Sequence, residues 1–233
     1  MKTLKNIIIF IILFFIFLYK DLFYLIPLKL LNIDYKTLSN NQELLLSIFS
    51  SSILVIITII IYRKYLKEKI IEYKNNFNEY FDIGIRYWLV GLVGMAVFNI
   101  LISTLSPVSQ ANNEALVQEM LKNSPILTFI SASFIAPFLE EMLFRKSFGD
   151  IFKNKKIMVI ASGFFFGLLH VIFSLKTPWD LLYILPYGML GGAFAYTLYK
   201  KDNIFITITF HMLHNGLLTL VSILLPILLK TLR

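Results

Sequence analysis

Long apolar runs separated by short charged segments dominate the chain. Each of seven such runs approaches the roughly 20 apolar residues that a helix needs to cross the hydrocarbon core of a bilayer. They cover residues 6–28, 44–62, 83–105, 126–146, 157–174, 181–199 and 204–229. The pattern predicts an all-α, polytopic transmembrane helix bundle of about seven spans. Pro226 interrupts the last run, so an eighth span is the alternative if that run breaks in two.

The first run has two interpretations. Lys2 and Lys5 precede it, as in a signal peptide, but it ends in Tyr19, Lys20 and Asp21 with no small-residue cleavage site. We therefore expect a retained anchor helix.

Positive charge follows every second apolar run. The segments after runs 44–62, 126–146 and 181–199 are rich in Lys and Arg, whereas the segment 106–124 carries only Lys122. The positive-inside bias predicts a cytoplasmic N-terminus and, with seven spans, an external C-terminus. The mixed charges of segment 63–82 predict a solvated amphipathic helix at the cytoplasmic surface. The polar segment 106–124 is expected to form an external loop.

Composition narrows the class of protein. Of 233 residues, 58% are hydrophobic and 15% are charged, and the mean hydropathy is +0.74. A soluble domain is typically about half apolar and about a quarter charged, so a soluble fold is excluded. The net charge of +8 lies beside the apolar runs, which favours anionic lipid over nucleic acid as its partner. Because the chain has no Cys, disulfides, thiolate metal sites and a cysteine nucleophile are excluded.

Ionisable residues at membrane depth are functional candidates, because burying each in lipid costs about 2.5–3.5 kcal/mol. Run 126–146 ends with Glu140, Glu141 and Arg145. Glu141 and Arg145 are one helical turn apart and are expected to pair. The adjacent Glu140 points about 100° away and is left to act as a general base. The alternative is that both glutamates lie at a wet helix end.

Run 157–174 contains Phe166 and His170, four residues apart. A lone histidine in a helix is more often a hydrogen-bonded structural residue than a catalytic one. Gly163 and Gly167 share the same spacing and predict a close approach to a neighbouring helix.

Run 204–229 contains His211 and Asn215, which project from one helix face. Two such donors are able to hold one oxyanion. The alternative is a polar clasp between helices. His214 lies between them, and its role stays open.

These clusters occur in three of the last four runs, whereas the first three runs have almost no ionisable residue. We therefore predict a site in which Glu140, aided by His170, takes a proton from water. His211 and Asn215 would hold the oxyanion that forms when the hydroxide attacks a peptide carbonyl. Glu141, Arg145 and Phe166 are expected to support these groups.

The ordered motifs Glu-Glu-x-x-x-Arg, Phe-x-x-x-His and His-x-x-x-Asn appear as Glu140-Glu141…Arg145, Phe166…His170 and His211…Asn215. From Ile126 onward the chain resembles the CAAX protease and bacteriocin-processing (CPBP, Abi) family. This resemblance implies a catalytic membrane domain over residues 126–229, preceded by N-terminal transmembrane helices over residues 1–105. It also implies an intramembrane endopeptidase; eukaryotic relatives trim prenylated CAAX proteins, and bacterial ones are linked to peptide processing and bacteriocin self-immunity.

The resemblance leaves the cofactor open between none and Zn²⁺. The family is commonly described as metalloproteases, and Glu140, His170 and His211 would supply three zinc ligands with a fourth position for water. However, the chain has no His-Glu-x-x-His helix, and zinc would take His211 away from the oxyanion pair. The residues favour a glutamate mechanism without metal.

One geometric condition applies to this site. If the helix ends with the run at Lys146, Glu140 and His170 differ in depth by about 10 Å at about 1.5 Å per residue. Strong tilt, or a helix that protrudes past the bilayer, would bring them level; we expect tilt.

Two other functions remain open: a transporter or proton pathway, and a non-catalytic scaffold or immunity protein. The abundance of Lys, Asn and Ile is typical of an AT-rich bacterial genome. The expected substrate is therefore a short amphipathic peptide, such as a bacteriocin or signalling-peptide precursor, cleaved at the cell membrane.

Overall fold

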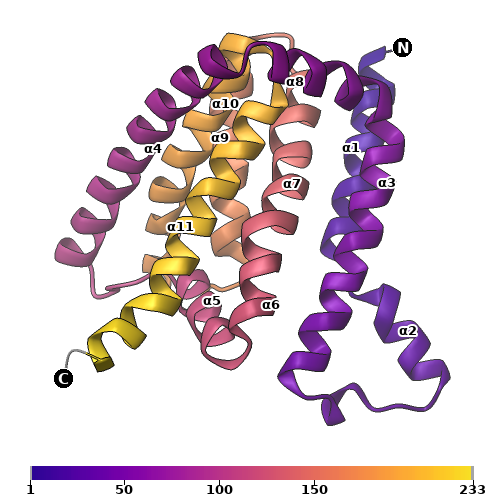
Figure 1. The fold of residues 1–233 in the computed structure, drawn as a ribbon, viewed down its shortest axis with the longest axis vertical. Helices are drawn as coiled ribbons and strands as arrows, with labels where there is room; N and C mark the ends of the chain where they lie inside the picture. The colour runs from indigo at the N-terminus through magenta and orange to yellow at the C-terminus, as the bar shows by residue number, and fades with distance from the viewer. Residues whose placement is uncertain (1, 232–233) are drawn as a thin grey trace.

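The computed structural model describes residues 2–231, which contain no strand, and the predicted all-α helix bundle is confirmed (Figure 1). Its main elements are α1 (Lys2–Leu18), α2 (Leu22–Leu30), α3 (Asn40–Asn75), α4 (Phe77–Leu105), α5 (Asn112–Asn123), α9 (Lys155–Ile172), α10 (Ile184–Lys201) and α11 (Ile204–Thr231). Two 3₁₀ turns, η1 (Tyr35–Thr37) and η4 (Pro178–Tyr183), precede α3 and α10.

Within residues 2–231, six helices are long and apolar enough to cross a membrane, or seven if the bent pair α1 and α2 forms one span. The chain is therefore a multi-pass membrane protein. The alternative of an eighth span is not realised, because α11 continues through Pro226 to Thr231.

The first run is not one straight helix: α1 and α2 are bent by 53°. The bend falls at the polar residues that end the run. Lys20 Nζ contacts Asp21 and, on α3, Ser47 Oγ, both at 3.0 Å. The charged side chain of Lys20 thus has polar partners at the turn where α1 ends.

Segment 63–82 is helical, as predicted, but most of it prolongs α3, which has 36 residues. The later part of α3 crosses the end of the bundle towards the start of α4 (Figure 1). It is not simply solvated, because Leu66 and Tyr73 are buried. The side chain of Asn203 donates to the carbonyl of Lys69 at 2.9 Å, which ties α3 to the turn before α11.

The expected external loop 106–124 is wrong in its second half, where α5 forms. Leu121 on this helix is buried, and α5 packs against α6 and α11 (Figure 1). Val117 and Leu121 are four residues apart and lie on one apolar face of this helix. That face is enough to hold α5 against the bundle.

The fourth run forms one long composite helix, Pro125–Ile151. It contains α6 (Pro125–Ile130), α7 (Ala136–Glu140) and α8 (Ser147–Ile151), separated by π-helical turns η2 (Ser131–Ile135) and η3 (Glu141–Lys146). Such wide turns disturb the regular hydrogen-bond ladder. Side chains bond to carbonyls in or beside them: Asn215 to Ala132 at 2.9 Å, Ser147 to Met142 at 3.1 Å and Ser162 to Phe144 at 2.7 Å.

Helices α9 and α10 approach closely at glycines, as predicted. A Cβ atom added at Gly167 would lie 2.5 Å from the carbonyl oxygen of Ile184, and one at Gly163 would lie 2.8 Å from that of Gly188. Neither distance leaves room for a side chain. The contact places the Phe166 and His170 face of α9 beside α10.

Candidate functional site

The four predicted catalytic residues come from three helices and line one cavity of about 210 Å³. Glu140 comes from the end of α7, His170 from α9, and His211 and Asn215 from α11. Glu140 Oε2 lies 3.9 Å from His170 Nε2 and 3.7 Å from His211 Nε2. The expected tilt stays a prediction, but the composite helix continues past Lys146 to Ile151, beyond the end of the apolar run. This added length meets the geometric condition.

Phe166 explains the orientation of His170. The imidazole Nδ1 lies 2.8 Å from the backbone carbonyl oxygen of Phe166, one turn earlier on α9. Because a carbonyl only accepts hydrogen bonds, Nδ1 carries the proton, and Nε2 is left facing Glu140. The ring also stacks on Tyr187 with centroids 4.7 Å apart. His170 is therefore fixed both by its own helix and by α10.

Glu141 points away from the cavity into a fully buried ion pair. Its Oε2 lies 3.2 Å from Arg145 Nε, and neither side chain is exposed. The guanidinium carbon of Arg145 lies 4.2 Å from the centroid of the Phe166 ring, a cation–π contact. The Glu141–Arg145 pair predicted from the sequence is present, and the ring of Phe166 packs against its guanidinium group.

His211 lies between the two carboxylates. Its Nδ1 contacts Glu141 Oε1 at 2.8 Å, and its Nε2 faces Glu140. With both glutamates ionised, Arg145 balances only one negative charge. His211 is the imidazole that both carboxylates face.

Asn215 has one of its amide hydrogens engaged. Its Nδ2 donates to the carbonyl of Ala132 at 2.9 Å, so α11 is clasped to the π-helical turn η2. A side-chain amide has two N–H donors, and the Asn215 side chain lines the cavity. The second donor is therefore free for a ligand in the cavity.

His214, whose role the sequence left open, lies in the wall of the same cavity and is 4% exposed. Trp88 Nε1 on α4 lies 3.3 Å from His214 Nδ1. An indole N–H only donates, so Nδ1 accepts and the hydrogen of the neutral ring is on Nε2. Sequence reasoning missed Trp88; its only signal was an aromatic residue with a polar group inside an apolar run.

The donor types around Glu140 suit zinc, but their spacing does not. Two ligands of a tetrahedral zinc lie about 3.4 Å apart when each bond is near 2.1 Å. The two imidazole nitrogens lie 3.7 and 3.9 Å from Glu140 Oε2. Within residues 2–231, no group of three His, Asp or Glu side chains has the arrangement of a metal site. The residues as placed do not fit the ion, and no chemical step is derived through it.

Comparison with known proteins gives a family for the second half of the chain. Residues 122–217 match the family described as "Type II CAAX prenyl endopeptidase Rce1-like". In Lactococcus lactis subsp. lactis, "UPF0177 protein YaiF" is 34% identical over 90 residues, and "UPF0177 protein YxdF" is 28% identical over 138 residues. In Bacillus subtilis, "Putative membrane peptidase YdiL" is 24% identical over 117 residues. No solved structure matches.

These alignments cover 39%, 56% and 49% of this chain, and 38%, 73% and 44% of YaiF, YxdF and YdiL respectively. The chain thus spans well under half the length of two of these three relatives. The family match nevertheless contains the three motifs that run from Glu140 to Asn215. Over residues 122–217, the chain is therefore similar to the Rce1-like CAAX prenyl endopeptidases.

Proposed function

We propose that this protein is an intramembrane endopeptidase that hydrolyses a membrane-associated peptide with Glu140 as the base. The observation that carries the proposal is the setting of Glu140 Oε2. This atom is buried, has no hydrogen-bond partner among the described residues, and faces two imidazole nitrogens at the wall of a cavity. The similarity of residues 122–217 to the Rce1-like CAAX prenyl endopeptidases supports the same reaction class.

The separations of 3.7 and 3.9 Å are too long for direct hydrogen bonds and suit a water molecule between the groups. Glu140 takes a proton from this water while the oxygen attacks the carbonyl carbon of the scissile bond. The protonated Glu140 then delivers that proton to the leaving nitrogen as the carbon–nitrogen bond breaks. The products are a carboxylic acid and an amine. His170, with Nδ1 bound to Phe166, orients the water through Nε2.

The negative charge that develops on the carbonyl oxygen needs preorganised donors. In the proposed mechanism these are Nε2–H of protonated His211 and the free N–H of Asn215. Glu141 holds His211 through Nδ1, and Arg145 neutralises Glu141. The catalytic unit in this proposal is the predicted domain 126–229, with α4 and α5 completing the cavity.

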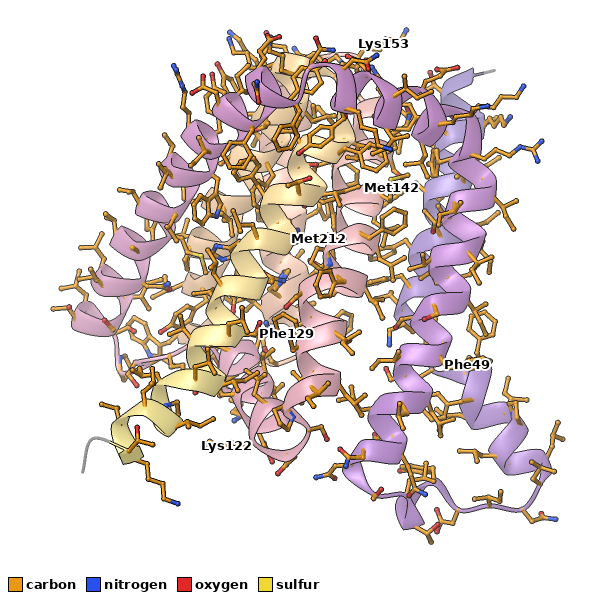
Figure 2. All side chains as sticks on the ribbon, viewed as in Figure 1. Phe49, Lys122, Phe129, Met142, Lys153 and Met212 are labelled. Atoms are coloured by element: carbon orange, nitrogen blue, oxygen red, sulfur yellow. The ribbon has the colours of Figure 1, made fainter. Side chains whose placement is uncertain are left out.

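We further propose that the N-terminus is cytoplasmic. Because the chain has no Cys, single-cysteine variants report its orientation directly. Lys122 and Lys153 are exposed at opposite ends of the bundle (Figure 2). A membrane-impermeant maleimide added to intact cells is expected to label Lys122→Cys at once, and Lys153→Cys only after the cells are permeabilised. The reverse pattern would invert the proposed orientation.

The expected substrate is a short amphipathic peptide precursor. Purified protein in liposomes should cleave members of a panel of such peptides, with the products identified by mass spectrometry. The cleavage rate is expected to be unchanged after treatment with a strong chelator. Loss of cleavage that added zinc restores would refute the mechanism without metal. If the wild-type protein cleaves no peptide with or without zinc, the scaffold function gains support instead.

A further inference from the structure

A second cavity of about 430 Å³ adjoins the site cavity between α4, α5, α10 and α11. The two cavities share five lining residues: Met95, Glu114, Tyr187, His214 and Leu218. Shared walls on this scale make them one cleft, which extends from Glu140 to the side of the bundle that carries α5. We call the two parts the inner and outer cavity.

The carboxylates that line this cleft face no Lys or Arg in its walls. Glu114, in the first turn of α5, is the one charged side chain among the described residues that line the outer cavity. The inner cavity adds Glu140 and the histidines, and no Lys or Arg lines either part. A narrow cleft with carboxylates in low-dielectric walls attracts cations.

Glu114 is half-buried, and its known contacts leave it able to bind a cation. Its Oε1 accepts a hydrogen bond from Gln118 Nε2 at 3.2 Å, and it forms no ion pair within residues 2–231. An acidic residue in a first helical turn also stabilises the helix dipole. That role explains an acid in the first turn of α5, but it does not explain why the acid lines both cavities. Glu119, on the same helix, is exposed and lines neither cavity. The position of Glu114 at the junction needs a separate reason.

We propose that Glu114 selects a basic residue of the substrate, so that the peptides cleaved here are cationic. This inference rests on the proposed endopeptidase function. A peptide whose scissile bond lies beside Glu140 continues into the outer cavity, and each extended residue advances it by about 3.3 Å. A Lys or Arg a few residues from the scissile bond then reaches the carboxylate of Glu114.

The test measures kcat/KM on a cleavable peptide and on copies in which each flanking position carries Lys, Gln or Glu in turn. At one position, wild-type protein should prefer Lys over Gln by about tenfold, the size of one charge-assisted hydrogen bond. Glu114→Gln should lose this preference and cleave the Lys and Gln peptides with about equal kcat/KM. Glu114→Lys should prefer the Glu peptide.

The matched control is Glu119→Gln, which removes an equal charge from the exposed side of α5. It should keep the full preference for Lys. The inference is overturned if Glu114→Gln retains the preference, or if Glu119→Gln loses as much of it.

Binding to the Glu140→Gln variant in nanodiscs separates the two proposals, because it requires no catalysis. Fluorescence anisotropy of labelled Lys and Gln peptides should show the same preference of about tenfold, and Glu114→Gln in this background should abolish it. Glu114-dependent binding without any wild-type cleavage would count against the endopeptidase function alone. Cleavage without a preference that depends on Glu114 would count against the substrate class alone.

Discussion

Replacement of Glu140 by Gln is expected to lower kcat by about a hundredfold to ten-thousandfold, the contribution typical of a general base. Glutamine has nearly the same shape but accepts no proton from water. The Glu140 side chain is 13% exposed, and its Oε2 makes no hydrogen bond within the described residues, so the fold should tolerate the change. Peptide cleavage in liposomes measures kcat, and thermal unfolding in detergent checks the fold.

Asp150→Asn is the matched control for Glu140→Gln. Asp150 lies on the same composite helix but outside the cavity, where it pairs with Lys146 at 2.5 Å. Its replacement should leave kcat within about twofold of the wild-type value, as is usual for substitutions away from a site. If Glu140→Gln cleaves as fast as this control, Glu140 is not the base. Glu141 would not replace it easily, because Arg145 and His211 already bind its carboxylate.

The helices and the candidate residues were readable from the sequence because their signals are local. Runs of apolar residues are a property of each segment alone, and Glu140, His170 and His211 stand out because ionisable groups are costly in lipid. The sequence did not show that these side chains meet in one site. Their meeting depends on where the composite helix ends and on the π-helical turn η3, in which the carbonyl of Phe144 accepts a hydrogen bond from the distant Ser162.

The sequence also did not predict that α4 and α5 form walls of the cleft. α5 is short and contains no long apolar run, and Leu121 and Val117 hold it against the bundle. Trp88 reaches His214 from α4, which the three motifs do not include. The catalytic roles of the site residues and the division at residues 105 and 126 stay predictions, because neither the geometry nor the family match tests them.

Arg145→Met is expected to lower the free energy of unfolding by about 3–5 kcal/mol, the cost of leaving one partner of a buried ion pair uncompensated. Methionine roughly keeps the length of the side chain but removes the positive charge beside Glu141, and both residues are fully buried. The cation–π contact with Phe166 is lost as well. Chemical unfolding in mixed micelles, followed by tryptophan fluorescence and circular dichroism, measures the change.

Arg86→Met gives the control for Arg145→Met, because Arg86 pairs with Asp82 at the same four-residue spacing while its side chain is 71% exposed. Breaking such a surface pair should cost at most about 1 kcal/mol. The double variant Glu141→Gln, Arg145→Met should recover part of the loss, since it removes both buried charges together. If Arg145→Met unfolds no more easily than Arg86→Met, the pair does not support the site through stability. Glu141 would then act on catalysis only through its contact with His211.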